Sequence, residues 1–149
     1  MIMKNEFMRL AIEQAKIAAS EGEVPVGAVI VKNGEVIAEG RNFRERSGLA
    51  EGHAEMMAIH EACKALHSPF LEGCDIYVTL EPCPMCAGAI LQARMHKVIF
   101  GAYEEKSGAV GSVLNLFYDY RFPHNVLFEG GVLQEECKTL LRDFFKEKR

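Results

Sequence analysis

The sequence predicts an α/β protein in three layers, with helices on both faces of a mixed central sheet of about five strands. Asn33-Gly34 is a strong two-residue turn signal between the apolar segments 26–31 and 36–38, and it indicates an antiparallel hairpin. Farther along, a strand, a helix and a second strand follow one another over residues 75–102. That order is typical of two parallel strands joined by a crossover helix. A sheet with both pairings runs in mixed directions.

Each element is predicted from its own local pattern. Three segments repeat apolar residues at helical spacing, and Gly22 follows the first of them as a stop signal. Pro84 suits the first turn of a further helix. Residues 41–52 are polar and aperiodic, so we expect a loop there that leads into His53. In chain order the predicted elements are helix 6–20, strands 26–31 and 36–38, helix 54–66, strand 75–80, helix 84–94, strand 97–102, a weaker strand 126–129 and helix 133–145.

Length and composition fit a single domain over residues 1–149. A chain of 149 residues can bury a sizeable core, and 49% hydrophobic and 26% charged residues are ordinary for a globular protein. Charged residues interrupt the first 20 positions, and no apolar run is long enough to span a membrane. We therefore expect a cytoplasmic protein with no secretory signal and no membrane partner.

The net charge of −4 does not favour nucleic-acid binding, because the average field of the protein repels phosphate. Any RNA contact would need a local basic patch. Residues 138–149 offer one, with five basic residues against two acidic ones and with Phe144 and Phe145 beside them. These rings could stack on unpaired bases, or they could belong to the core while the charges form a solvated helix face.

The cysteines divide into two groups. Their total of five is odd, which argues against a closed disulfide framework. Cys63, Cys74 and Cys137 lie among apolar residues, and we expect them to be small core residues. Cys83 and Cys86 are different, because they form a Cys-x-x-Cys pair at the expected start of a helix.

The most informative motifs are His53-Ala54-Glu55 and Pro82-Cys83-Pro84-Met85-Cys86. Zinc in catalytic sites typically takes three protein ligands and leaves its fourth tetrahedral position to water. His53, Cys83 and Cys86 fit that set for one zinc ion per subunit. A spacing of three puts both cysteines on one face of a helix, whose positive end favours the thiolate form that binds metal.

Two plainer interpretations of the cysteine pair stay open. It could be a redox couple, which would leave His53-Ala54-Glu55 unexplained. It could also be half of a structural zinc site, because other histidines and cysteines are available as a fourth ligand, although none forms an obvious second pair. The second interpretation leads to a zinc-stabilised interaction module without enzymatic activity.

The H-x-E and P-C-x-x-C combination is the signature of zinc-dependent nucleobase deaminases. Zinc lowers the pKa of its bound water toward neutrality, so zinc-bound hydroxide would be the nucleophile that attacks the ring carbon carrying an exocyclic amine. Glu55 would then be the catalytic proton shuttle, which moves the proton of water to a ring nitrogen and then to the departing amine. Ammonia leaves and a carbonyl remains.

Longer stretches of the chain resemble the bacterial tRNA-specific adenosine deaminases, within the zinc-dependent cytidine/deoxycytidylate deaminase superfamily. The likeness covers nearly the whole chain and is carried by residues 23–29, 53–59, 79–89, 100–102, 107–112 and 137–145. It implies a cytidine-deaminase-like α/β/α fold and hydrolytic conversion of adenosine to inosine at the wobble position of tRNA. It also implies the tRNA anticodon loop as partner and a homodimer.

The resemblance further implies substrate contacts. Asn42 would hydrogen-bond the flipped-out nucleotide, although it could also be an ordinary asparagine at a strand end. Glu104 stands where the family commonly has an aspartate for a sugar contact. Arg41 and Arg44-Glu45-Arg46 depart from the loop expected before the zinc histidine. Four further residues would help to line the base pocket, namely Pro25, Val26, Gly27 and Ala54.

The alternative function is deamination of a free base or nucleoside, such as guanine or cytosine. The motif Pro82–Cys86 and the helical segment 62–66 would suit a guanine deaminase as well. A small base can be sealed under the C-terminal segment, whereas RNA needs an open pocket flanked by basic surface. The stretch Ser107–Ser112 favours the tRNA assignment.

Overall fold

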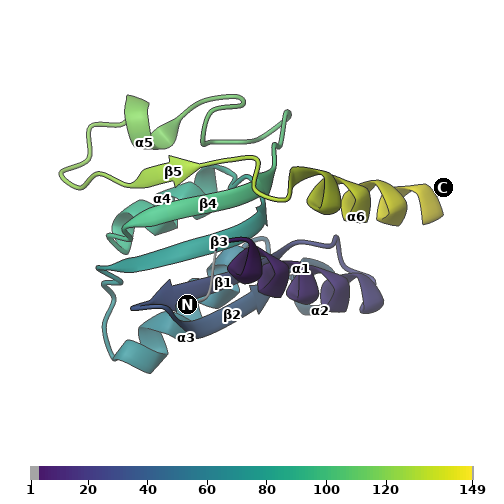
Figure 1. Cartoon of the computed structure of the whole chain (residues 1–149), viewed down its shortest axis with the longest axis horizontal. Helices are drawn as coiled ribbons and strands as arrows, with labels where there is room; N and C mark the ends of the chain where they lie inside the picture. Colours follow the sequence, from purple (N-terminus) through teal and green to yellow (C-terminus); the bar gives the residue numbers. More distant parts are fainter. Residues whose placement is uncertain (1–3, 149) are drawn as a thin grey trace.

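The computed structural model describes residues 4–148, whose five strands form one sheet between two layers of helices (Figure 1). The strand order is β2-β1-β3-β4-β5. β1 pairs antiparallel with both β2 and β3, whereas β3, β4 and β5 run parallel. The predicted mixed sheet of five strands is therefore confirmed. Its strands are β1 (Gly27–Lys32), β2 (Glu35–Arg41), β3 (Cys74–Leu80), β4 (Lys97–Ala102) and β5 (Leu127–Glu129).

Helices cover both faces of the sheet, as the three-layer prediction requires. In Figure 1, α1 and α6 lie in front of the sheet, and α3 and α4 lie behind it. Each face has its own apolar core, because successive side chains of a strand point to opposite faces. On β3, for example, Ile76 packs with the α3 and α4 side and Tyr77 with the α1 and α6 side. The helices are α1 (Lys4–Ser20), α3 (Ala54–Leu66), α4 (Pro84–Gln92) and α6 (Gln134–Glu147).

The predicted hairpin joins β1 and β2. Asn33 and Gly34 both have positive φ, at 52° and 78°, which is the backbone geometry of the type I′ turn that Asn-Gly favours. β2 continues three residues past the expected end at Ala38 and ends at Arg41, next to Asn42.

Two glycines bring helices close to the sheet at the site end. A Cβ atom on Gly27 would overlap the backbone of α1 at Ala11 and Ala15. A Cβ atom on Gly40 would overlap the first turn of α3, where the carbonyl of Ala54 sits. Gly40 therefore allows the start of α3 to lie directly on the edge hairpin, and this fixes where His53 enters the structure.

Three further details differ from the sequence predictions. The segment 41–52 contains a short helix α2 (Arg44–Ser47), and a second short helix, α5 (Leu116–Asp119), was not predicted. Helix α4 ends at Gln92 and not at Arg94, because Arg94 adopts the left-handed conformation with φ of 58°.

Cys74 and Cys137 are buried as expected, whereas Cys63 is half-buried. All five cysteines are free thiols. Among residues 4–148, no helix has the length and apolar character that crossing a bilayer requires.

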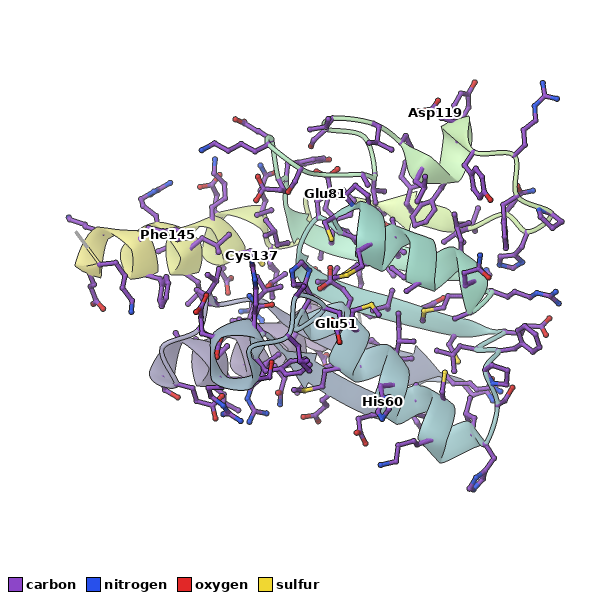
Figure 2. All side chains as sticks on the ribbon, turned by 180° about the vertical axis from the view of Figure 1, so that it is seen from behind. Glu51, His60, Glu81, Asp119, Cys137 and Phe145 are labelled. Carbon is purple, nitrogen blue, oxygen red and sulfur yellow. The ribbon has the colours of Figure 1, made fainter. Side chains whose placement is uncertain are left out.

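The C-terminal helix makes few core contacts. Cys137 is its buried residue, and Figure 2 shows Phe145 farther along α6, where the helix runs beyond the ends of the strands. Phe145 is 48% exposed. The basic residues Lys138, Arg142, Lys146 and Lys148 are all exposed, so this helix presents a basic surface to solvent.

Candidate functional site

The predicted metal ligands meet where β3 ends and where α3 and α4 begin. His53 is the N-cap residue of α3, and Cys83 is the N-cap residue of α4. Cys86 lies in the first turn of α4, which begins with Pro84. The positive ends of two helix dipoles therefore point at one place, and this favours negative charge, such as that of a thiolate, at the site.

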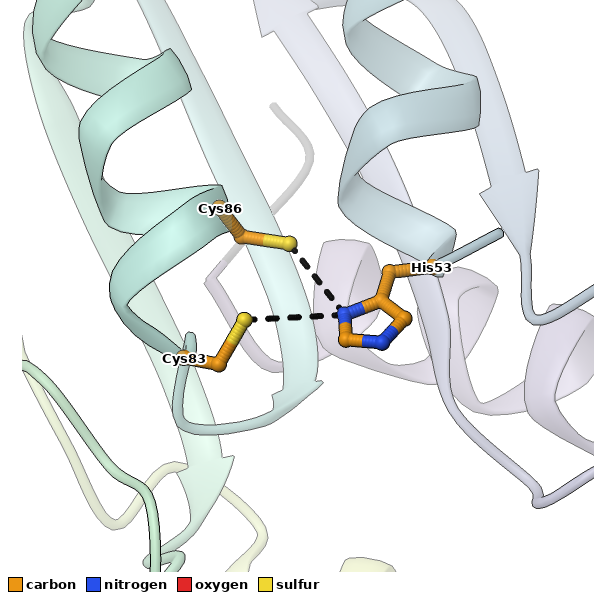
Figure 3. Close-up of side chains that lie close together, drawn as sticks. All are labelled: His53, Cys83 and Cys86. Carbon is orange, nitrogen blue, oxygen red and sulfur yellow. Dashed lines mark hydrogen bonds between the residues drawn. The ribbon is translucent and has the colours of Figure 1, made fainter. Parts of the chain in front are cut away.

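The geometry of the three ligands fits zinc. Nδ1 of His53 lies 3.6 Å from Sγ of Cys83 and 3.5 Å from Sγ of Cys86, and both sulfurs point at that nitrogen (Figure 3). Tetrahedral zinc, with Zn–N near 2.0 Å and Zn–S near 2.3 Å, requires an N···S distance of about 3.5 Å. The imidazole nitrogen that faces the sulfurs is Nδ1, a choice that the sequence left open.

No fourth ligand completes the group within residues 4–148. The ligand atoms of His53, Cys83 and Cys86 lie within 4.8 Å of one another, and no other histidine, cysteine or carboxylate of the described chain joins them. Three protein ligands leave one tetrahedral position free, which is the arrangement of catalytic and not of structural zinc sites. The structural-zinc and redox interpretations of the cysteine pair are therefore less favoured than the catalytic one.

The two thiols shift one another's pKa in opposite directions. A hydrogen bond from the Cys86 thiol, and a second from His53, lower the pKa of Cys83 to about 4. Donating that hydrogen bond, together with burial, raises the pKa of Cys86 far above its ordinary value. The hydrogen bond with Cys83 also raises the pKa of His53. Since a metal binds thiolates and neutral imidazole, loading this site must release protons.

Glu55 lies at the same place but is not part of the ligand group. Its side chain is almost completely buried, with 4% exposure, in the first turn of α3. Burial raises the pKa of Glu55 to about 7. A carboxyl group with a pKa near neutrality can both accept and donate a proton at that pH.

A cavity of about 250 Å³ opens beside these residues. Arg44, Glu45 and Ser107 are exposed residues of its lining, so the cavity reaches the protein surface. The lining comes from four parts of the chain: Glu23, Val24 and Val26 before β1; Asn42, Arg44 and Glu45 after β2; His53 and Glu55 on α3; and Leu80, Cys83, Glu104 and Ser107 around the ends of β3 and β4.

The structure brings part of the predicted substrate site to this cavity. Asn42, Val26 and Glu104 line it together with Glu55. Gly27 is not a lining residue: it packs against α1, and its N–H donates to Oγ1 of Thr79 at 3.1 Å. Pro25 and Ala54 are buried and are also outside the lining. For all six residues, contact with a substrate stays a prediction.

Two buried carboxylates at this end of the sheet received no role from the sequence. Glu23 is 1% exposed and accepts hydrogen bonds from the backbone N–H groups of Glu45 and Arg46, at 3.0 and 2.8 Å. Glu81 is 2% exposed and accepts bonds from the segment 104–112. In the sequence, each of these glutamates is only a charged residue next to apolar neighbours and a proline. That pattern does not predict which distant backbone N–H groups the carboxylate binds.

Comparisons with known proteins agree with this geometry. Residues 1–102 match the family model of the cytidine and deoxycytidylate deaminase zinc-binding region. The tRNA-specific adenosine deaminase of Bacillus subtilis is 52% identical over 143 residues, which cover 96% of this chain and 89% of that protein. A structure from a study of A-to-I editing by tRNA:A34 deaminases is 40% identical, with a TM-score of 0.89 over 93% of this chain and 100% of that chain.

A guanine deaminase from Bacillus subtilis is also similar, at 41% identity, but with a TM-score of 0.66 over 68% of this chain and 66% of that one. His53, Cys83 and Cys86 all lie inside the region that the family model matches. This chain belongs to the zinc-binding cytidine and deoxycytidylate deaminase family, and within it to the group of the tRNA-specific adenosine deaminases.

Proposed function

We propose that this protein deaminates adenosine to inosine at the wobble position of tRNA. The observation that carries the proposal is a three-ligand zinc site with a free, buried carboxylate beside it, in a chain that is 52% identical to a tRNA-specific adenosine deaminase. A three-ligand zinc site leaves the fourth coordination position free for water or substrate, and a deaminase needs a group close to that position that can accept and donate protons.

The residues of the site have two separate roles, metal binding and proton transfer. His53, Cys83 and Cys86 would hold the zinc ion, and that ion would supply the Lewis acidity that makes water a nucleophile near neutral pH. Glu55 would accept the first proton of that water and deliver it to a ring nitrogen of adenine. It would then carry the second proton, from the hydroxyl group left on the ring carbon, to the departing amine, so that ammonia leaves and a carbonyl remains. Because Glu55 is buried and not a ligand, its carboxylate is free for both transfers.

The cavity would receive a single flipped-out base. A base in an anticodon loop is already unpaired, so bringing it into the cavity costs less than extrusion from a duplex. Asn42, Val26 and Glu104 all line the cavity, and we expect them to contact the nucleotide. The exposed lining residues at the mouth, such as Arg44, leave a route by which the connected strand reaches the surface.

The flanking nucleotides need a basic surface, since the chain as a whole carries a net charge of −4. The exposed face of α6 provides it through Lys138, Arg142, Lys146 and Lys148. Phe145 is half exposed beside them and can stack on an unpaired base. Phe144 is less available, because its ring packs edge-on against Phe145 and under the ammonium group of Lys148.

Deamination of a free base such as guanine is the second candidate, and the partial likeness to a guanine deaminase is the observation in its favour. The open mouth of the cavity and the basic α6 argue for the larger substrate. Incubation of the zinc-loaded protein with tRNA, and separately with guanine, cytosine and adenosine, tests both. Inosine in tRNA supports the proposal, and efficient turnover of a free base without inosine in tRNA supports the alternative.

We also propose that the enzyme is a homodimer and that it works in the cytoplasm, where a tRNA substrate would be met. The outer side of α3 and the preceding loop enclose an apolar groove of about 670 Å³, next to the helix that carries His53. Its apolar lining residues are Phe43, Leu49, Met56, Met57 and Ile59. Apolar surface of this kind is typical of contacts between subunits. Light scattering of the purified protein tests the proposal, because a mass near 16.6 kDa would contradict it.

A further inference from the structure

Glu81 is a buried carboxylate without a cationic partner. It is 2% exposed, directly after β3 and before Pro82, and Figure 2 shows it beside the start of α4. No ion pair within residues 4–148 involves it. A buried charge without such a partner is strongly unfavourable unless hydrogen bonds replace the lost water. The groups that supply those bonds therefore indicate what Glu81 does.

All of its donors come from one distant segment, residues 104–112. Oε1 accepts from the backbone N–H of Glu104 at 3.0 Å and from the hydroxyl of Ser112. Oε2 accepts from the backbone N–H groups of Val110 and Ser112, at 2.9 and 3.1 Å. A carboxylate is an acceptor only, so each of its oxygens can receive two donors in this way. The four bonds tie both ends of the segment to one point.

The segment 104–112 packs against residues 81–82, which directly precede the zinc ligand Cys83. A Cβ atom on Gly108 would overlap the carboxylate of Glu81, so the loop can approach this closely only with glycine there. The N–H of Ala109 donates to the carbonyl of Pro82 at 2.9 Å. Pro82 precedes Cys83, and the loop is therefore held against the start of the metal-binding helix.

The same segment carries two residues to the cavity, Glu104 and Ser107. The carboxylate of Glu104 is itself held within the loop, where it accepts from the N–H of Lys106 at 3.0 Å. We propose that Glu81 is a positioning residue for substrate binding: through the backbone of residues 104–112 it fixes this wall of the cavity relative to Cys83. The inference rests on the proposed function, because the substrate it positions is the tRNA nucleotide.

Glu81→Gln tests the inference in the zinc-loaded enzyme. An amide has one acceptor oxygen, and its NH₂ group would face backbone N–H donors. We expect about one zinc ion per chain as in the wild type, a rise in the KM for tRNA of about tenfold, and a kcat within about threefold of the wild type. Hydrogen exchange of the 104–112 amides should accelerate. The matched control is Glu72→Gln, an exposed carboxylate-to-amide change, which should alter none of these values.

A wild-type KM in Glu81→Gln, a loss confined to kcat, or a loss of zinc would each overturn the inference. If that variant does not fold, Ser112→Ala replaces it, because it removes one hydroxyl donor at an exposed residue and keeps the carboxylate. Its KM must then rise about twofold with zinc retained, and an unchanged KM overturns the inference. A wild-type protein that forms no inosine in tRNA contradicts the proposed function instead, and the exchange rates of the loop alone then decide whether Glu81 holds it.

Discussion

Nδ1 of His53 lies 3.5 Å from Sγ of Cys86, although the two residues are 33 positions apart in the chain. His53 is the N-cap residue of α3 and Cys86 lies in the first turn of α4, and both helices lie on one face of the sheet. A zinc ion bound between them links these helices, so the metal has a structural consequence besides its chemistry. The site can therefore be tested through stability and metal content as well as through activity.

Cys86→Ser should lose zinc and stability together. Serine cannot replace the thiolate, so we expect zinc well below one per chain and a lower Tm than the zinc-loaded wild type. A chelator should lower the Tm of the wild type and leave that of the variant unchanged. Metal analysis and calorimetry measure both effects. Cys63→Ser is the control that should retain zinc, and a zinc-replete Cys86→Ser protein would contradict the ligand assignment.

Glu55→Gln and Glu55→Ala should keep zinc and lose activity. The carboxylate serves several proton transfers, and such groups contribute on the order of 10²–10⁴-fold each. We therefore expect at least a ~100-fold lower kcat, with a zinc content equal to that of the wild type. Inosine formation in tRNA and metal analysis of the same samples provide the measurement. Wild-type turnover in either variant would show that the proton carrier lies elsewhere.

Removing the basic residues of α6 should weaken tRNA binding and leave the zinc site and the deamination step unchanged. In the triple variant Arg142→Ala, Lys146→Ala, Lys148→Ala we expect a higher KM for tRNA, an unchanged zinc content and a weaker dependence of binding on salt. Three lost phosphate contacts to single-stranded RNA reduce the slope of log K against log salt by about 2. The double variant Lys16→Ala, Lys64→Ala removes exposed charges elsewhere and should leave the slope as it is. An unchanged slope in the triple variant would exclude α6 from the RNA contact.

Glu129 should contribute a small, pH-dependent part of stability. Lys4 and Lys97 lie 2.7 and 3.2 Å from its carboxylate, and the hydrogen bond from Lys4 is the main cause that lowers the pKa of Glu129 below its ordinary 4.5. A lowered folded pKa means that the contribution is complete above pH 4.5 and is lost as the pH falls through the folded value.

Glu129→Gln measures that contribution. Because the side chains of Glu129 and Lys4 are more than a third exposed, we expect the variant to be less stable than the wild type by only roughly 0.5 kcal/mol at pH 7. The difference should shrink toward zero in acid and in high salt. Urea unfolding of both proteins in parallel provides the measurement. A difference that grows in acid would have the wrong sign for this ion pair.

The fold was largely predictable because its signals are local. The Asn33-Gly34 turn, the helical periodicities and the strand-helix-strand order each depend on neighbouring residues, and the structure confirms them. Helix α2 escaped prediction because Arg44–Ser47 is too short for a periodic pattern, and because its N-terminal N–H groups are satisfied by Glu23, more than 20 positions away.

The part of the site that could be predicted is the part whose residues occur in short motifs with a characteristic spacing. His53, Cys83 and Cys86 fall within two short motifs, and the structure brings them together at zinc distances. Glu81 could not be assigned in this way, because its four donors lie 23 to 31 positions farther along the chain. Its role depends on how the loop 104–112 folds back over β3, which no local pattern encodes.

The most direct test of the account is position-resolved sequencing of tRNA after incubation with the zinc-loaded enzyme, with Glu55→Gln in parallel. Inosine is read as guanosine, so the modified position is identified directly. We predict inosine at the wobble adenosine with the wild type and almost none with Glu55→Gln. Unmodified tRNA with an active, zinc-loaded protein that releases ammonia from free guanine or cytosine would contradict it.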